Sequence, residues 1–165
     1  MSTAMPDGGY GKLKPSTGAV SPPPQSDEEL EAPVGIPHAV LFTGPAAVGK
    51  HASALWWARL FKCRARAVCD PVCIDCKRLG AGSHPDVAAL APEAPGKAIG
   101  IDPVRDLIRM MSLKRVSPGP RIAIVREAHQ LSFEAQSALL KLLEEPPGTA
   151  LIVLVTENPA ALLPR

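Results

Sequence analysis

From residue 38 onward, short apolar runs alternate with longer segments whose apolar residues recur every three or four positions. The short runs predict β-strands at His38–Thr43, Val87–Leu90, Arg121–Val125 and Ala150–Val155. The longer segments predict helices at Gly49–Phe61, Asp102–Lys114 and Phe133–Glu144. Strands that alternate with helices favour an α/β fold, in which a parallel sheet is covered by helices on both faces.

Local signals set the expected ends of two of these helices. Asp102 followed by Pro103 indicates a helix start with proline at the first helical position. Ser132 is a preferred N-cap residue for the helix that follows it, and Pro146 cannot continue that helix. We therefore expect the last predicted helix to run from Phe133 to Glu144.

The first part of the chain differs in composition. Residues 1–36 are rich in proline, glycine and serine, and their few apolar residues show no period. Burial of these few apolar residues cannot offset the conformational entropy that the chain would lose on folding. We therefore expect a disordered tail before a folded domain at 37–165. A solvated tail is favoured over a proline-rich ligand for an SH3-type domain, because no basic P-x-x-P module stands out.

Charge and hydropathy exclude some classes of protein. The net charge of +2 is too small to imply nucleic-acid binding by itself, and the basic residues form no stripe with interleaved aromatics. The N-terminus has no apolar signal-peptide core, and the longest apolar run, Ala150–Val155, is too short to cross a bilayer. We expect a soluble, cytoplasmic protein without a membrane partner.

A phosphate-binding loop stands between the first predicted strand and the first predicted helix. Its residues fit G-x-x-x-x-G-K and are Gly44, Pro45, Ala46, Ala47, Val48, Gly49, Lys50 and His51. The glycines let backbone N–H groups point at phosphate oxygens, and Lys50 would reach the terminal phosphates. The next residue should be Ser or Thr, which ligates Mg²⁺, but His51 occupies it. A glycine-rich turn with a solvated lysine is the alternative.

The second half of such a site normally lies after a later strand, where an Asp holds Mg²⁺ and a Glu orients the attacking water. Here Glu127 is present, but Arg126 occupies the Asp position. A guanidinium cannot ligate Mg²⁺ and repels it at close range. With His51, two metal contacts are missing, which argues against efficient ATP hydrolysis. Alternatively, Arg126 pairs with a surface acid and the active site lies elsewhere.

The four cysteines of the chain lie within one short segment: Cys63, Cys69, Cys73 and Cys76. Closely spaced thiols in a cytoplasmic chain favour a structural Zn²⁺ site over disulfides. We expect a small zinc module at residues 62–78. Unbound thiols and an iron–sulfur cluster are the alternatives.

Three motifs together carry a family resemblance: the phosphate loop with its cysteine insert, Gly82-Ser-His-Pro-Asp86, and Leu139-Leu-Lys-Leu-Leu-Glu-Glu-Pro-Pro147. The chain resembles the AAA+ clamp-loader subunits of bacterial DNA polymerase III, and the second motif is similar to that of the delta-prime branch. Within that branch the ATPase motifs are often degraded, as His51 and Arg126 are here.

The resemblance implies a partial AAA+ domain with possible ATP binding, in which Thr156 is the sensor of the γ-phosphate and the four cysteines bind zinc. It also implies a hetero-oligomer with delta and gamma/tau subunits, within the DNA-directed DNA polymerase holoenzyme. The sliding clamp and primer–template DNA would be reached through that assembly. The alternative functions are an active gamma/tau-type ATPase, or a zinc-stapled binding module without nucleotide.

The chain departs from the family in three respects. Five, three and two residues separate its cysteines, where the family usually has eight, two and two. A proline-rich tail replaces the family's ordered helix before the loop. Finally, the family's fifth strand, helical lid and collar have no counterpart before Arg165. We therefore expect a fragment or a shifted reading frame, with the strand at Ala39–Phe42 exposed at a sheet edge and prone to aggregation.

Overall fold

A four-stranded parallel sheet forms the centre of the computed structural model, which describes residues 37–63 and 73–162. The strands pair in the order β1-β4-β3-β2, and all neighbours run parallel. Their bounds are Ala39–Thr43 (β1), Val87–Leu90 (β2), Arg121–Val125 (β3) and Ala150–Thr156 (β4). The predicted tail at residues 1–36 lies outside the described residues.

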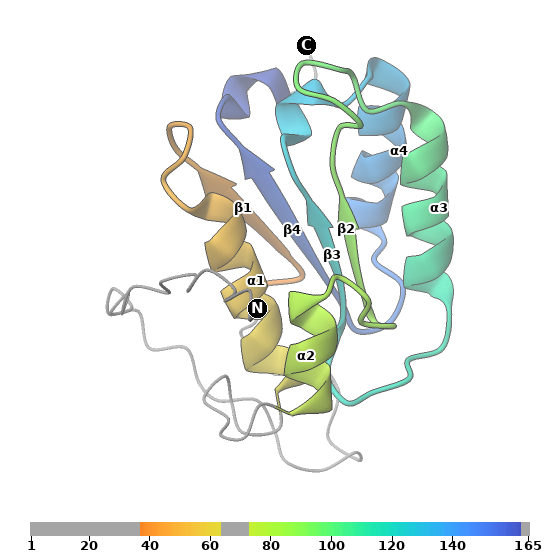
Figure 1. Cartoon of the computed structure of the whole chain (residues 1–165). Helices are drawn as coiled ribbons and strands as arrows, with labels where there is room; N and C mark the ends of the chain where they lie inside the picture. The colour runs from red at the N-terminus through yellow and green to blue at the C-terminus, as the bar shows by residue number, and fades with distance from the viewer. Residues whose placement is uncertain (1–36, 64–72, 163–165) are drawn as a thin grey trace, which may run out of the picture.

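Helices cover both faces of this sheet, as the alternating pattern predicts (Figure 1). The α-helices are Lys50–Lys62 (α1), Ile74–Gly80 (α2), Ile101–Ser112 (α3) and Phe133–Glu144 (α4), and short 3-10 helices lie at Ala128–Gln130 (η2) and Pro159–Leu162 (η3). Among the described helices, none combines the length and apolar character that crossing a membrane requires.

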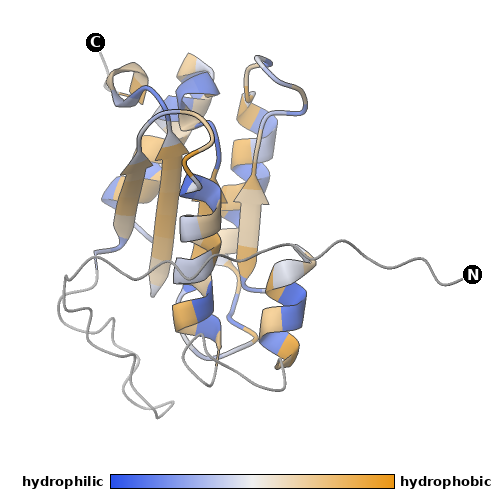
Figure 2. Ribbon diagram, turned by 60° about the vertical axis from the view of Figure 1, so that its left-hand side comes forward, coloured by the Kyte–Doolittle hydropathy of each residue, from blue (hydrophilic) through white to orange (hydrophobic). Residues whose placement is uncertain are grey.

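The alternation of side chains along β3 divides the core into two layers. Ile122 and Ile124 pack with residues of α1 and α2 on one face, whereas Ala123 and Val125 pack with α3 and α4 on the other. All five residues of β3 are buried, which explains why this strand reads as a continuous apolar run after its first residue. Figure 2 shows the same arrangement, with apolar strands between helices whose polar residues face outward.

The sequence predicts most of the element bounds. The structure confirms β2, β3 and α4 at the predicted residues, and Ser132 caps α4 by accepting a hydrogen bond from the N–H of Ala135 at 3.2 Å. The start of α3 was predicted wrongly. Its N-cap is Gly100, so Pro103 is not the first helical residue. Pro103 instead lies at the third helical position, within the first turn, where its missing N–H needs no intrahelical partner.

Helix α2 was not predicted at all. It begins inside the predicted zinc module at residues 62–78 and runs two residues past it, and its seven residues give too short an apolar pattern to reveal a helix. Cys73 is its N-cap residue, and the Cys73 Sγ atom accepts a hydrogen bond from the N–H of Cys76 at 3.5 Å. Tertiary contacts with α1 hold this helix in place.

Strand β1 lies at one edge of the sheet, as expected. Within the described residues it pairs with β4 alone, from Ala39 opposite Ile152 to Thr43 opposite Thr156. The side chain of Leu41 is 46% exposed, in contrast to the buried strands at the centre.

Candidate functional site

The predicted phosphate loop connects the carboxyl end of β1 to the first turn of α1. Gly49 is the N-cap of α1 and adopts a left-handed conformation with φ 87°, which glycine tolerates without strain. Ala47 has a positive φ of 60° although it is not glycine. Strand, loop and helix thus follow one another as the motif requires.

The Lys50 side chain folds back over this loop. Its ammonium donates hydrogen bonds to the carbonyl oxygens of Gly44, at 2.8 Å, and Pro45. The Nζ atom also lies 3.8 Å from a carboxylate oxygen of Glu157, which follows β4. The lysine side chain is only 9% exposed, so its ammonium is held at the loop by these contacts.

A cleft of about 280 Å³ joins the loop to the ends of β3 and β4. The described residues that line it are Ala47, Gly49, Lys50, His51, Arg126, Glu127, Val155 and Glu157. The structure therefore brings His51 and Arg126 to the same cleft, although they lie far apart in the sequence. Burial, and then the charge of Arg126, lower the pKa of His51. Both effects favour the uncharged form of its imidazole.

Two residues at this cleft, His51 and Arg126, are not ligands that Mg²⁺ prefers, although the carboxylates of Glu127 and Glu157 also line it. This ion prefers oxygen ligands in octahedral geometry, and the two positions where the motif calls for them hold an imidazole and a guanidinium. No contact among the described residues supports the alternative that Arg126 pairs with a surface acid. Within the described part of the chain the Arg126 side chain forms no ion pair. The backbone N–H of Arg126 donates to the carbonyl oxygen of Leu90 at 2.7 Å.

Thr156 belongs to a separate hydrogen-bond chain beside the cleft. Its hydroxyl accepts from the N–H of Asn158 at 3.1 Å and lies 3.2 Å from Nδ1 of His129. The other ring nitrogen of His129 is 3.8 Å from Glu127, whose backbone has a positive φ of 48°. The fully buried Thr156 is not among the described residues that line the cleft. Sequence reasoning missed His129, because only the fold brings it next to Thr156.

A second cleft, of about 370 Å³, adjoins the first and shares Arg126 and Glu127 with it. Its remaining described lining residues are Ala91, Pro92, Glu93, Ala94, Pro95, Gly96 and Gln130. This set offers no further cation, so the phosphate-binding features gather in the first cleft.

Three of the four predicted zinc ligands meet at the other end of the molecule. The Sγ atoms of Cys63, Cys73 and Cys76 all lie within 4.8 Å of one another, and those of Cys63 and Cys73 are 4.0 Å apart. Tetrahedral Zn²⁺ with thiolate bonds of about 2.3 Å places its sulfur ligands about 3.8 Å apart, and the Cys63–Cys73 distance is close to this value, so the three cysteines could hold a metal ion. Cys69, the fourth predicted ligand, lies outside the described residues.

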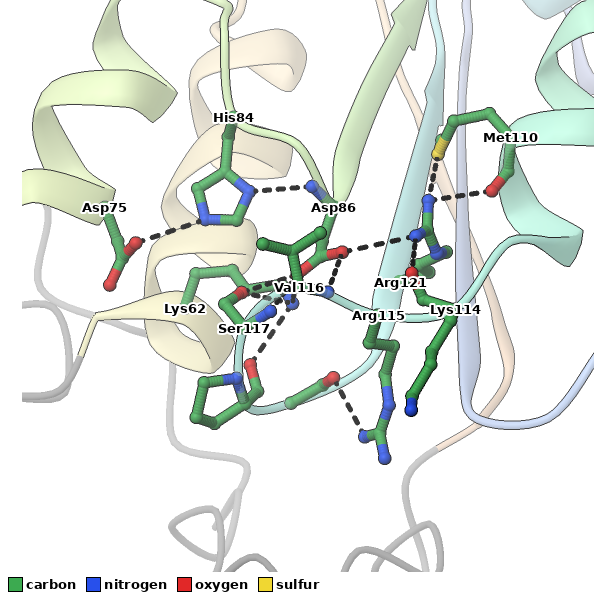
Figure 3. Close-up of polar contacts among 12 residues, drawn as sticks. Lys62, Asp75, His84, Asp86, Met110, Lys114, Arg115, Val116, Ser117 and Arg121 are labelled. Carbon is green, nitrogen blue, oxygen red and sulfur yellow. Dashed lines mark hydrogen bonds and ion pairs between the residues drawn. The ribbon is translucent and has the colours of Figure 1, made fainter.

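A buried polar network surrounds Asp86, whose side chain is fully inaccessible to solvent (Figure 3). Its carboxylate accepts from the Val116 N–H at 2.9 Å, and from the N–H and hydroxyl of Ser117 at 2.7 and 2.6 Å. The Lys62 ammonium, also fully buried, lies 3.3 Å away, and the Arg121 guanidinium lies 3.5 Å away. Asp86 thus ties α1 and the loop before β3 to the start of β2.

His84 extends this network towards the cysteine cluster (Figure 3). Its Nδ1 atom accepts from the Asp86 N–H at 3.1 Å, and its Nε2 atom lies 3.6 Å from Asp75, the neighbour of Cys76 in α2. Burial, and then the charge of Lys62, lower the pKa of His84. The sequence marks His84 and Asp86 as parts of a family motif but does not indicate that they anchor the cysteine-bearing helix.

Comparison with known proteins gives one consistent family. Residues 31–165 match the family described as "DNA polymerase III, delta subunit". The chain is 38% identical over 129 residues to DNA polymerase III subunit delta' of Pseudomonas aeruginosa, covering 77% of this chain and 39% of that protein. It is 34% identical over 128 residues to subunit delta' of Bacillus subtilis, covering 76% of this chain and 38% of that protein.

Two further likenesses widen the picture. Subunit tau of Bacillus subtilis is 34% identical over 124 residues, covering 74% of this chain and 22% of that protein. A DNA polymerase III gamma subunit-related protein from Thermotoga maritima has a similar structure, with a TM-score of 0.56 and 24% identity over 76% of this chain and 36% of that chain. This last likeness supports the fold alone. The chain spans 39% and 38% of the length of the two delta' relatives.

Proposed function

The chain belongs to the DNA polymerase III delta subunit family, and from this premise we propose that it acts as a delta-prime-like subunit of the clamp loader. In this role it supports loading of the sliding clamp during DNA replication, in the cytoplasm, without hydrolysing ATP efficiently itself. The two delta' relatives and the Gly82-Ser-His-Pro-Asp86 motif support the delta-prime branch over gamma/tau.

One observation carries the proposal of a degenerate ATPase. His51 and Arg126, which replace the two Mg²⁺ ligands, line the same cleft beside the phosphate loop. Without a metal ion, the charge on a transferring phosphoryl group loses its main electrostatic partner. The role proposed for Glu127, orientation of an attacking water, then has no activated phosphate to act on.

The cysteine cluster supports a structural zinc site in this proposal. Cys63, Cys73 and Cys76 would hold the ion, and Cys69 is the expected fourth ligand. A closed tetrahedral site has no open position for a reacting water, so its contribution is to stabilise the fold. Here it would fix α2 against the end of α1, since Cys63 follows α1 directly.

The proposed partners are the delta and gamma/tau subunits, with the clamp and primer–template DNA reached through the complete assembly. The chain spans less than half the length of its delta' relatives, so its association with these partners needs a direct binding experiment. Co-elution of the purified chain with delta and gamma/tau of the same organism, on size-exclusion chromatography, is the expected result. A chain that elutes separately from both the delta and the gamma/tau subunits would contradict the proposed assembly.

ATP turnover tests the second part of the proposal. We expect the purified chain to release phosphate no faster than a buffer control in the presence of Mg²⁺, and turnover near the ordinary enzyme range of about 1 per second would refute a degenerate ATPase. His51→Thr combined with Arg126→Asp restores the consensus ligands and serves as a matched variant for Mg²⁺-dependent nucleotide binding.

A further inference from the structure

The position where the motif calls for an Mg²⁺-binding aspartate holds a cation, Arg126, instead. Arg126 lines the cleft beside Lys50 and the loop, and within the described part of the chain its guanidinium has no carboxylate partner. A typical site of this kind holds an aspartate and a divalent cation, which together present one net positive charge to the phosphates. A single arginine presents the same net charge without a metal ion.

The acidic residues of the cleft have other partners. Glu157 lies 3.8 Å from the Lys50 ammonium, and Glu127 lies 3.8 Å from the imidazole of His129. Neither carboxylate forms an ion pair with Arg126 in the described part of the chain. The guanidinium, with its planar set of donors, is therefore available to an oxyanion.

His51 supplies a second unused polar group. Its Nδ1 atom is buried and has no hydrogen-bond partner within the described residues. A buried nitrogen without a partner costs free energy, which a ligand oxygen in hydrogen-bonding distance would recover. A neutral imidazole has one N–H donor and one acceptor nitrogen, so the tautomer with its proton on Nδ1 can donate a hydrogen bond to a ligand oxygen.

We propose that this cleft binds the phosphate chain of a nucleotide or an inorganic polyphosphate without a divalent metal ion, with Arg126 in place of the metal and its aspartate. The inference rests on the phosphate loop of the proposed function and deepens it. Lys50 exchanges the carbonyl oxygens of Gly44 and Pro45 for phosphate oxygens when the ligand enters. The backbone N–H groups at the start of α1 complete the site.

Isothermal titration of the full chain with ATP and with inorganic tripolyphosphate tests this proposal. Each titration is run in buffer without added divalent ions, with free metal removed beforehand by a resin so that the proposed zinc site keeps its ion, and again in millimolar Mg²⁺. We expect the two dissociation constants for each ligand to differ by less than about threefold. Tripolyphosphate should displace ATP, because the phosphate chain is the recognised group. ATP binding that tripolyphosphate does not displace would overturn the assignment to phosphates.

Variants identify the residue responsible. Arg126→Gln should weaken binding in the Mg²⁺-free buffer by about tenfold or more, since a charge-assisted hydrogen bond is lost. Arg109→Gln, which removes an exposed arginine of α3, is the matched control and should leave binding unchanged. The double variant His51→Thr/Arg126→Asp should bind ATP only when Mg²⁺ is present.

The outcomes separate this inference from the proposed function. Binding by the unaltered chain that requires Mg²⁺ overturns the metal-free site but leaves a nucleotide loop in place. Absence of binding in both buffers, by a chain whose circular dichroism shows a cooperative melt, overturns the metal-free site together with the nucleotide loop. Equal affinity of Arg126→Gln and the unaltered chain in the Mg²⁺-free buffer overturns the role of Arg126. None of these results depends on association with other subunits.

Discussion

Removing the Asp86 carboxylate should destabilise the fold more than removing its lysine partner. Asp86→Ala leaves the fully buried ammonium of Lys62 without its counter-ion, and breaking a buried pair in this way costs about 3–5 kcal/mol. In Lys62→Met, by contrast, Asp86 keeps its hydrogen bonds from Val116 and Ser117. We expect Lys62→Met to cost about 1 kcal/mol, because burial already lowers the pKa of Lys62 and so disfavours its charged form.

The same carboxylate should make stability depend on pH. Burial alone would raise the pKa of Asp86, but hydrogen bonds from Ser117 and Val116, with the charge of Lys62, lower it from 3.8 to about 2. A lowered folded pKa contributes stability that is fully present above the unfolded pKa and is lost as pH falls through the folded value. The shift corresponds to about 2 kcal/mol, at roughly 1.4 kcal/mol per unit.

Urea unfolding followed by tryptophan fluorescence measures both effects. Trp57 packs against the rings of Phe42 and Phe61, with centroids 6.1 Å away in each case, so its emission reports loss of the α1 layer. The gap in unfolding free energy between the unaltered chain and Asp86→Ala should stay constant from pH 7 to 5 and shrink by about 2 kcal/mol towards pH 2. The double variant Lys62→Met/Asp86→Ala should be more stable than Asp86→Ala alone.

Two results would refute this reasoning. Asp86→Ala as stable as the unaltered chain at pH 7 would show that the network contributes nothing. A double variant less stable than Asp86→Ala would show that the lysine stabilises the fold without the carboxylate, and that the cost does not come from an unpaired charge.

Three further predictions use the same unfolding assay or a metal titration. Gly119→Ala should cost more than about 2 kcal/mol, since its Cβ would lie 2.7 Å from a backbone oxygen of α1, whereas Gly96→Ala has an open site and pays mainly for its positive φ. Ser132→Ala should cost about 1 kcal/mol through the lost cap of α4, with the exposed Ser137→Ala as control. Cys76→Ser should lower the zinc released to a colorimetric chelator, and equal release would contradict the cluster.

Sequence patterns predicted the parts of the fold that depend on local chemistry. Residues Ile122–Val125 form a short, continuous apolar run, and such a run is enough to indicate a buried strand. Ser132 has its partner three residues away, so a helix start could be inferred without knowledge of the tertiary structure. The conformation of the predicted phosphate loop also depends on residues close together in the sequence, because Gly44 and Gly49 both have positive φ angles.

Contacts between distant residues could not be predicted in this way. Lys62 lies in the last turn of α1, where a lysine normally extends into solvent, yet its side chain is fully buried against Asp86, 24 residues away. Ser117 is a further 31 residues from Asp86. The pairing of His51 with Arg126 in one cleft was suggested only by the motif, and their common location follows from the parallel order of β1, β4 and β3.

That parallel order also separates the two functional regions of the molecule. The phosphate loop follows β1 and Arg126 follows β3, so the cleft lies at the carboxyl ends of the strands, where ligands bind in open α/β sheets. His84 and Asp86 precede β2, so their network and the cysteine cluster lie at the amino ends. Changes at one end should therefore not affect the other. Asp86→Ala should lower the free energy of unfolding while the folded fraction binds tripolyphosphate with unchanged affinity. Arg126→Gln should weaken tripolyphosphate binding and leave the free energy of unfolding unchanged. Among the described residues, no contact of the Asp86 network passes through His51 or Arg126, so changes at these two positions should leave the scaffold intact.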